Sequence, residues 1–257
     1  MLRSNGEIQG AVTNITDIAS VENDPKGHAR GEVVRRFIEG LPPGRLLDIG
    51  CYTGYITASF RGRHELHGID IADKALAVAA ERGFTVVHGD IELGLPYGDG
   101  SFDIVFMGET LEHCIRTDFV LSEVNRVLRI GGHLVITVPN VASLISIAMV
   151  TFNHHPFLGS GYRTGHVRDF TTRSLREALS NNGFRLIAMH GCEAALPGPM
   201  TALLRPIAVA IPRIASQLIA LTEKTRDVRF NPEEEITIPD HVHQSFLQNV
   251  WKIISGR

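Results

Sequence analysis

Short apolar runs alternate with amphipathic stretches through the middle of this sequence, and this alternation constrains the fold more than any other feature. Helical patterns separate the runs, for example at 73–83 and 119–129. Strands that alternate with helices form βαβ units, whose right-handed crossovers give a parallel sheet. We therefore expect an α/β fold with a doubly wound, mostly parallel sheet. The expected strands in this part of the chain are 45–50, 65–70, 84–90, 102–108 and 131–140.

The flanking regions add further elements to this core. A helical pattern over 28–41 stops at Pro42-Pro43-Gly44, and a capped helix is expected over 171–184. Strands are expected at 185–190 and, by period-two counting, at 246–255. The expected organisation is an N-terminal cap helix region at 1–44, a core at 45–191, a helical insertion or lid at 192–245, and a C-terminal strand at 246–257 that completes the sheet.

Composition excludes some classes of function. The formal charge of −3 offers no excess of cations for phosphates, which argues against a dedicated nucleic-acid binder. Three widely spaced cysteines, Cys51, Cys114 and Cys192, fit neither a disulfide framework nor a metal knuckle. Together with an N-terminus that lacks the apolar stretch of a signal peptide, they favour a cytoplasmic location.

One apolar segment, 201–221, leaves contact with a membrane open. Arginines and prolines at 205–206 and 212–213 interrupt it, so it fails the criterion for a membrane span. An amphipathic helix that lies on a membrane surface remains an alternative for this segment.

Acidic residues stand at three successive expected strand ends. Ligands of doubly wound sheets bind beyond these carboxyl ends. Asp70 lies 20 residues past Gly50, a spacing typical of a carboxylate that accepts hydrogen bonds from ribose hydroxyls. Asp90 could accept from the exocyclic amine of adenine while Ile91 packs on the ring. Asp48 could orient the glycine loop or a ligand ammonium.

The loop LLDIGCYTG carries Tyr52 where a dinucleotide-binding loop has its middle glycine. A tyrosine there would crowd a pyrophosphate, so the loop suits an adenosine ligand without phosphates, such as a sulfonium nucleoside. A helix is expected from about Gly54 to Phe60, with its positive end toward a ligand carboxylate.

Ordered motifs now give a resemblance. LLDIGCYTG, HGID, HGDIE, SFDIVFMGETLEH, LRIGGHLVITVPN and GHVRDFTTRSLREALSNNGF resemble those of class I S-adenosylmethionine-dependent methyltransferases, mostly within 45–140. The resemblance implies a seven-stranded Rossmann-like sheet, S-adenosylmethionine as cofactor and S-adenosylhomocysteine as product. Tyr52 departs from the glycine that is more frequent in the family. The expected cofactor-binding residues are Asp48, Gly50, Cys51, Tyr52, Gly54, Asp70, Ile71, Asp90, Ile91, Met107 and Gly108.

Candidates for catalysis follow the fourth expected strand. His113 has a pKa suited to taking a proton from a hydroxyl acceptor, with Glu112 as orienter or alternative base. His166 is a second candidate. The competing interpretation is that these histidines only brace their loops. Arg30 is interpreted as a surface arginine, with pairing to the cofactor carboxylate as the alternative.

No metal is expected. The two histidine pairs, at 154–155 and at 241 and 243, lack carboxylate partners at ligand spacing.

Two apolar stretches, 141–166 and 192–245, favour a small-molecule acceptor over nucleic acid. The Pro-Pro-aromatic turn of nucleic-acid amino methyltransferases is also absent. We expect O-methylation of a secondary metabolite, sugar, quinone or lipid-linked precursor. The alternatives are a non-catalytic protein that binds S-adenosylmethionine or S-adenosylhomocysteine for regulation, and a nicotinamide oxidoreductase, which the missing GxGxxG disfavours. The oligomeric state stays open.

Overall fold

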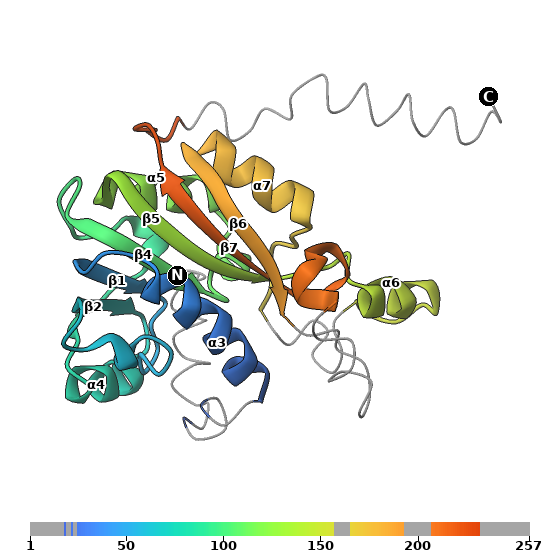
Figure 1. The fold of residues 1–257 in the computed structure, drawn as a ribbon, viewed down its shortest axis with the longest axis horizontal. Helices are drawn as coiled ribbons and strands as arrows, with labels where there is room; N and C mark the ends of the chain where they lie inside the picture. The colour runs from blue at the N-terminus through green and yellow to red at the C-terminus, as the bar shows by residue number, and fades with distance from the viewer. Residues whose placement is uncertain (1–17, 19–21, 23–24, 157–164, 193–206, 232–257) are drawn as a thin grey trace, which may run out of the picture.

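A computed structural model describes residues 18, 22, 25–156, 165–192 and 207–231 (Figure 1). The strands are β1 (Arg45–Ile49), β2 (Glu65–Asp70), β3 (Thr85–His88), β4 (Phe102–Gly108), β5 (Leu128–Pro139), β6 (Phe184–Cys192) and β7 (Gln217–Lys224). The helices used below are α3 (Pro25–Glu39), α4 (Asp73–Glu81), α5 (Thr117–Val127), α6 (Leu144–Thr151) and α7 (Thr172–Asn181).

The seven strands form one sheet in the order β3-β2-β1-β4-β5-β7-β6. Pairing is parallel from β3 to β5, and β7 is antiparallel to both β5 and β6. Strand order reverses between β1 and β4, so the sheet is doubly wound. The expected fold class is confirmed.

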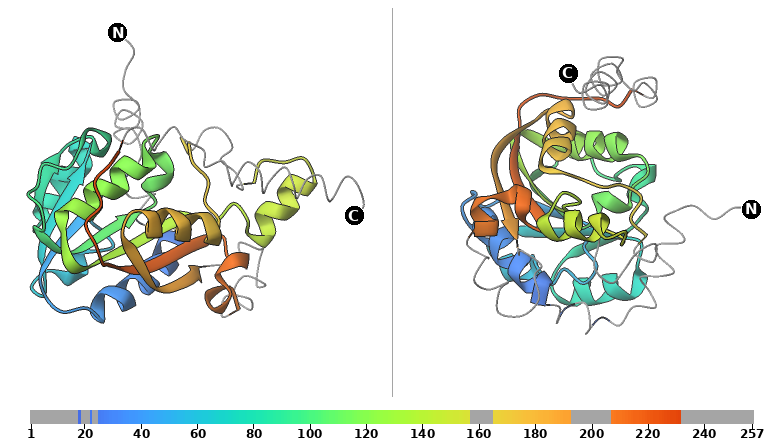
Figure 2. Two further views of the ribbon diagram at one scale, coloured as in Figure 1. Left: turned by 90° about the horizontal axis from the view of Figure 1, so that it is seen from above. Right: turned by 90° about the vertical axis from the view of Figure 1, so that its right-hand side faces the viewer.

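Helices cover both faces of the sheet (Figure 2). On one face, side chains from α5 and α7, such as Leu121 and Leu175, pack against Leu47 and Val105 of the sheet. On the other face, α3 packs its Val34 against a separate set of sheet residues, and α4 contributes to that cluster as well. Alternate side chains of each strand therefore pack into two hydrophobic cores, one on each face of the sheet. This explains why the strands are apolar almost throughout.

The helices α3, α4, α5 and α7 begin and end within a few residues of where the sequence patterns placed them. Thr171 and Ser174 form a capping box at the start of α7, and Gly183 follows that helix with a φ of 82°. α3 ends at Glu39, shortly before the two prolines that precede β1.

The seventh strand lies elsewhere than expected. The place between β5 and β6 is filled by β7, whose register pairs Leu218 with Val138 and with Gly191. Residues 217–224 were expected within the helical insertion, and that part of the prediction is wrong. The expected strand at 246–255 lies outside the described residues, so its structure stays untested.

Burial on both faces explains the error. Leu218, Ile219 and Ala220 are all fully buried, so β7 shows a continuous apolar run and no period-two alternation. Such a run cannot be told from the end of an apolar helix by its pattern alone. The segment that joins β6 to β7 is therefore 193–216, and its described part contains a helical turn at 207–210 and η5 (Pro212–Ile214).

The same strand corrects the interpretation of 201–221. Residues 217–221 belong to a strand of the sheet, with 218–221 buried, and cannot form an amphipathic helix on a membrane, while 201–206 lie outside the described residues. Within the described part of the chain, no helix is long and apolar enough to cross a membrane.

Replacement of Lys224 by methionine tests the position of β7. The Lys224 ammonium is buried and donates hydrogen bonds to the backbone carbonyls of Asn125 (2.7 Å) and Leu128 (2.8 Å) at the end of α5. Lys224→Met leaves these acceptors without their donor, so the free energy of unfolding should fall by about 2–4 kcal/mol. Urea denaturation measures this change.

Glu223→Gln is the matched control, because the neighbouring side chain pairs with the exposed Arg185. We expect it to cost less than about 1 kcal/mol. Equal, small losses for both variants would contradict the placement of 217–224 inside the sheet.

Candidate active site

The register of the parallel strands gathers the expected site residues at one edge of the sheet. Ile49 pairs with Ile69, and Asp70 pairs with His88, so β1, β2 and β3 end at the same level. β4 ends beside β5, where Gly108 pairs with Thr137. The carboxyl ends of these strands thus form one rim, where doubly wound folds bind their ligands.

Asp70 holds the loop that follows β1. Its Oδ2 accepts a hydrogen bond from the backbone N–H of Tyr52 at 2.8 Å, and its Oδ1 accepts from the N–H of Ala72 at 2.9 Å. Tyr52 itself has a φ of 50°, which is uncommon for a residue with a side chain. The tyrosine is therefore accommodated in this loop by a carboxylate that fixes its backbone.

Close packing explains the two glycines of this loop. Gly50 has a φ of 67°, and a Cβ built on it would lie 2.3 Å from Oγ1 of Thr110. A Cβ on Gly54, with a φ of 68°, would lie 2.6 Å from the ring of Phe84. Both positions thus exclude larger residues because of the protein's own atoms. Cys51 is buried and packs beside Gly68, so only its backbone can face a ligand.

The buried side chain of Asp48 ties the end of β1 to Thr57, at the end of the loop. It is 2% exposed, and its carboxylate accepts a hydrogen bond from the hydroxyl of Thr57. Burial raises the pKa of Asp48 to about 7, although the Thr57 hydroxyl opposes that shift. Contact of this carboxylate with a ligand ammonium stays a prediction.

The third carboxylate lies at the start of a short helical turn. Oδ1 of Asp90 accepts from the backbone N–H of Glu92 at 3.0 Å and so caps η2 (Ile91–Leu93). Ile91 is half-buried against the core. This geometry leaves lone pairs on Asp90 for a second donor.

The helix expected after Gly54 is wrong. Residues 55–57 form a turn, and only η1 (Ala58–Phe60) follows before the chain reaches β2. The segment between Gly54 and β2 is too short for a longer helix, and the Thr57 hydroxyl donates a hydrogen bond to Asp48. No helix N-terminus is therefore available to a ligand carboxylate here.

Glu109 is a site residue that the sequence analysis missed. It follows β4 directly, with a φ of 50°. Its carboxylate accepts hydrogen bonds from Oγ1 of Thr137 (2.9 Å) and Nε2 of Gln217 (3.1 Å). The only signal in the sequence was an acidic residue at the first position after a strand that ends on the rim.

Arg30 is not the surface residue that we expected. Its side chain is only 12% exposed, lies 3.5 Å from the Glu109 carboxylate and donates a hydrogen bond to the hydroxyl of Tyr55 at 3.2 Å. α3 therefore supplies a buried cation to this rim. Pairing of Arg30 with a cofactor carboxylate stays untested.

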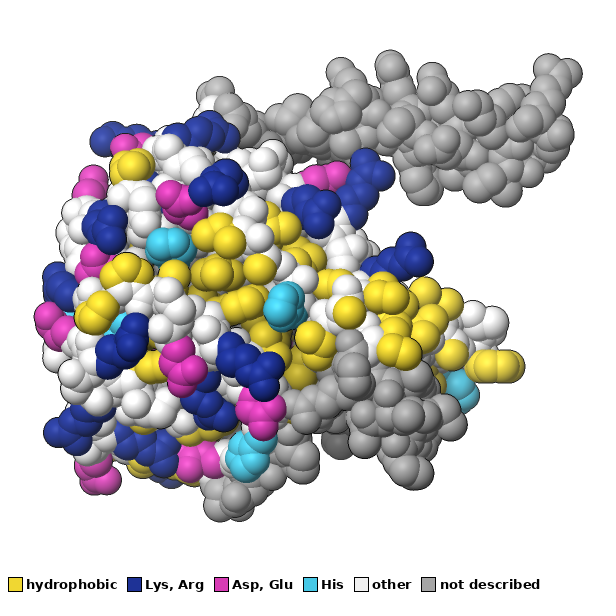
Figure 3. Space-filling model, in the orientation of Figure 1, with side chains coloured by type: hydrophobic (Ala, Val, Ile, Leu, Met, Phe, Trp, Pro, Cys, Tyr) yellow, Lys and Arg dark blue, Asp and Glu magenta, His cyan; other side chains and the backbone are white. Residues whose placement is uncertain are grey.

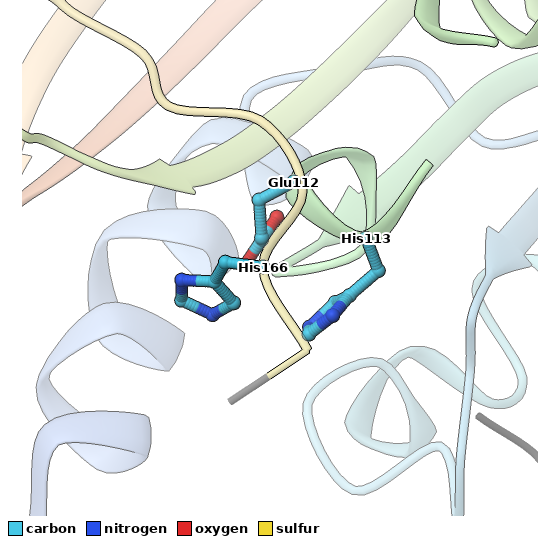
Figure 4. A group of neighbouring side chains, drawn as sticks. All are labelled: Glu112, His113 and His166. Carbon is cyan, nitrogen blue, oxygen red and sulfur yellow. The ribbon is translucent and has the colours of Figure 1, made fainter. Parts of the chain in front are cut away.

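The three catalytic candidates come together beyond β4 (Figure 4). Glu112 and His113 belong to η3 (Leu111–His113), and His166 belongs to the segment before α7. One nitrogen or oxygen atom from each side chain lies within 4.8 Å of the other two. The backbone carbonyl of Glu112 accepts hydrogen bonds from the N–H groups of Val167 (2.9 Å) and Arg168 (3.1 Å), which join the two segments.

The His113 ring has a defined tautomer. Its Nδ1 lies 3.2 Å from the carbonyl oxygen of Gly165, and because a carbonyl only accepts, Nδ1 carries the hydrogen. Nε2 then holds the lone pair whenever the ring is neutral. Burial lowers the pKa of His113, and burial followed by the adjacent His113 ring lowers the pKa of His166.

Glu112 is the most deeply buried member of the group. It is 1% exposed, and both of its carboxylate oxygens lack a hydrogen-bond partner among the residues that the structure describes. Burial, reinforced by the charge of Glu109, raises the pKa of Glu112 well above its ordinary value.

The rim fits a nucleoside without phosphates. The loop sequence from Leu46 to Thr57 contains no lysine or arginine that could meet a pyrophosphate. Asp70 and Asp90 each keep lone pairs for hydroxyl or amine donors beyond the backbone groups that they already bind. These acceptors therefore suit the hydroxyls of ribose and the amine of adenine.

Residues 47–136 match the family model described as a methyltransferase domain. The matched stretch runs from β1 into β5 and includes the loop, the three carboxylates and η3.

Two curated proteins share part of this sequence. The bifunctional methionine biosynthesis protein MetXA/MetW of Rhodopirellula baltica is 34% identical over 118 residues, which are 41% of this chain and 18% of that protein. A malonyl-[acyl-carrier protein] O-methyltransferase of Methylococcus capsulatus is 34% identical over 160 residues, 58% of this chain and 55% of the relative. The matched regions thus span 18% of the first relative's length and 55% of the second's.

A solved structure shares the fold. The geranyl diphosphate C-methyltransferase of Streptomyces coelicolor, crystallised with S-adenosyl-L-homocysteine, superposes with a TM-score of 0.59 at 12% identity. The superposition covers 87% of this chain and 98% of the other.

Asp48→Asn should change how stability depends on pH. The unfolded chain releases the Asp48 proton near pH 3.8, whereas the folded protein holds it to about pH 7. The stabilisation that this proton gives the folded state is fully present below the unfolded-state pKa of 3.8. It is lost as the pH rises through the folded-state pKa of about 7. The wild type should therefore lose on the order of 3 kcal/mol relative to Asp48→Asn across this window.

Chemical denaturation of both proteins at several pH values between 4 and 8 measures the difference. Asparagine keeps an oxygen that can accept from Thr57, so the comparison isolates the charge. A difference in unfolding free energy that stays constant with pH would show that Asp48 titrates normally.

Proposed function

We propose that this protein transfers a methyl group from S-adenosylmethionine to a small-molecule acceptor, because residues 47–136 match the model of a methyltransferase domain and the motifs resemble those of the class I S-adenosylmethionine-dependent family. The resemblance inferred from the sequence motifs, and the cofactor that it implied, are confirmed. The observation that carries the proposal is the rim itself. Carboxylates stand at the ends of three adjacent strands, around a loop whose own sequence contains no lysine or arginine, and the catalytic candidates follow the fourth strand.

The cofactor is assigned to the rim from β3 to β4. In this proposal Asp70 accepts hydrogen bonds from the ribose hydroxyls, and Asp90 with Ile91 holds the adenine. The backbone of 50–54, braced by Asp48, meets the amino-acid end. Ile71 and the end of β4 at Met107-Gly108 complete the pocket. Bound S-adenosylmethionine supplies a methyl group on a positively charged sulfur.

The acceptor is assigned to the end of η3. Methyl transfer is an in-line displacement, so the protein must hold the acceptor close, aligned and shielded from water. When the acceptor is a hydroxyl, Nε2 of His113 is the atom that takes its proton, because Nδ1 donates a hydrogen bond to the carbonyl of Gly165. Glu112 and His166 orient the ring and the acceptor.

The acceptor class that we propose is a small molecule with a hydroxyl and apolar parts: a secondary metabolite, sugar, quinone or lipid-linked precursor. α6 follows the carboxyl end of β5 and therefore starts at the same rim. Hydrophobic side chains gather over it (Figure 3). Leu144, Ile147, Val150 and Phe152 are each about half exposed or more. An apolar acceptor would find complementary surface there.

A cytoplasmic site of action belongs to the proposal. The three cysteines, Cys51, Cys114 and Cys192, are buried free thiols, as a reducing compartment allows. Nucleic acid is not proposed as acceptor, since the net charge is −3.

Asp70→Asn should weaken cofactor binding. Asparagine cannot accept on both atoms, so either the Tyr52 or the Ala72 N–H loses its partner and the ribose loses a charged acceptor. We expect the Kd for S-adenosylhomocysteine to rise at least about tenfold, because a hydrogen bond to a charged group contributes about 1.5–3 kcal/mol. Titration calorimetry measures the affinity.

The control for this variant is Asp73→Asn. Asp73 lies in the first turn of α4, close in sequence to Asp70, and its side chain is 77% exposed. The affinity of Asp73→Asn for S-adenosylhomocysteine should match that of the wild type. If the wild type does not bind S-adenosylhomocysteine, the proposed function is wrong.

His113→Asn should abolish most turnover while binding persists. The asparagine amide can keep the hydrogen bond to Gly165 but has no counterpart of Nε2. For a hydroxyl acceptor, kcat should fall by about 10²–10⁴-fold, the usual contribution of general base catalysis, at an unchanged Kd for the cofactor.

The assay uses radiolabelled S-adenosylmethionine against phenols, quinols, sugars, amines and carrier-held acyl groups. Tight binding of the cofactor with no labelled product from any of these classes would favour the non-catalytic alternative. An unchanged kcat in His113→Asn would remove His113 from the mechanism.

A further inference from the structure

We propose that Glu112, His113 and His166 form a binding site for a divalent transition-metal ion of borderline softness, with Zn²⁺ as its simplest probe. The inference goes beyond the proposed function and rests on the side chains alone. Among the described residues, these three are the only group of three or more histidine, cysteine or acidic side chains with ligand atoms this close together.

The unsatisfied carboxylate of Glu112 is the first observation. Its two oxygens are buried without a hydrogen-bond donor in the described structure, although a carboxylate offers about four acceptor sites. Burial of a carboxylate without partners is costly, so a proton or a cation is expected beside it. The charge of Arg30 also acts on Glu112, but the contacts of its guanidinium are with Glu109 and Tyr55.

The orientation of His113 is the second observation. Histidines that bind metals usually donate their other ring N–H to a backbone carbonyl or a carboxylate, which fixes the tautomer. His113 does so, through Nδ1 to the carbonyl of Gly165. The remaining nitrogen carries the lone pair that a metal requires. This arrangement exists without any ion, so the site is partly preorganised.

His166 completes the group from a second segment. Its ring lies 4.9 Å from the ring of His113, centroid to centroid, at an interplanar angle of 73°. The hydrogen bonds from Val167 and Arg168 to the Glu112 carbonyl fix the segment that carries it. Two imidazoles at this separation can converge on one ion without stacking.

The distances require only local adjustment. One ligand atom from each residue lies within 4.8 Å of the others. Atoms about 2.0–2.2 Å from a tetrahedral zinc ion lie roughly 3.4 Å apart. Side-chain rotations that move each atom by about an ångström would close the site.

The ligand types select the metal. Two imidazoles and one carboxylate suit Zn²⁺, Fe²⁺ and Co²⁺, whereas Mg²⁺ and Ca²⁺ prefer sites made of oxygen. Three protein ligands leave at least one position open, the arrangement of catalytic sites. An ion there would occupy the nitrogen that serves as base in the metal-free protein, so the two forms would activate an acceptor differently.

Metal binding is measured on the full chain without a histidine tag, after removal of metals with a chelator. Zn²⁺ is titrated by calorimetry, and Co²⁺ by visible absorption, which strengthens when the ion leaves water for a four- or five-coordinate site. The variants are Glu112→Gln, His113→Asn and His166→Gln. The control is His133→Gln, which alters a histidine near the opposite end of the sheet, where it pairs with Ile104.

We expect one equivalent of Zn²⁺ to bind to the wild type and to His133→Gln with equal affinity, and at least tenfold more weakly to each of the three variants. S-adenosylhomocysteine binding and the melting temperature show that each variant is folded, so failure of this proposal is distinct from failure of the proposed function. Zn²⁺ affinity that is the same in the wild type and in folded variants of this group would overturn the proposal. So would failure of the wild type to change the Co²⁺ spectrum.

Discussion

Parallel pairing of β3, β2, β1, β4 and β5 is the constraint on which the candidate site depends. It makes five strands end at one edge of the sheet. Residues that are far apart in the chain therefore become neighbours through backbone pairing alone. β6 and β7 extend this arrangement. Because β7 is antiparallel, its first residue, Gln217, lies opposite Pro139 at the end of β5 and reaches Glu109. An antiparallel strand thus contributes its beginning to a rim made of strand ends.

Buried acids at this rim are stabilised in different ways. Asp70 accepts from two backbone N–H groups and thereby fixes the loop at Tyr52. Asp48 accepts from one hydroxyl, and burial still raises its pKa to about 7. Glu112 has no hydrogen-bond donor among the described residues. Groups that are left unsatisfied in a folded protein, such as the Glu112 carboxylate, are the ones expected to act on a ligand.

The parallel core and the carboxylates could be predicted from the sequence, because both depend on local spacing within βαβ units. Features that depend on contacts between distant segments could not. Arg30 reads as a surface arginine on an amphipathic helix until α3 is packed against the rim, where it meets Glu109. β7 reads as helix because burial on both faces removes its alternation. The helix after Gly54 failed for a local reason that propensity does not show, since Thr57 is engaged with Asp48 and the chain enters β2 within a few residues.

Glu112 links the two halves of the acceptor side through different atoms. Its backbone carbonyl anchors the segment of His166, while its carboxylate lies among the two histidine rings. A substitution of its side chain leaves the carbonyl in place, so the chemistry of this group can change without release of the segment that completes it. The proposed cofactor side is built differently, because there the Asp70 side chain holds the loop and is also the group proposed to bind a ribose. Substitution there must disturb architecture and ligand together, whereas at Glu112 the two are separable. A fold that hosts many reactions gains from this separation, since the acceptor side can vary while the nucleoside rim stays constant.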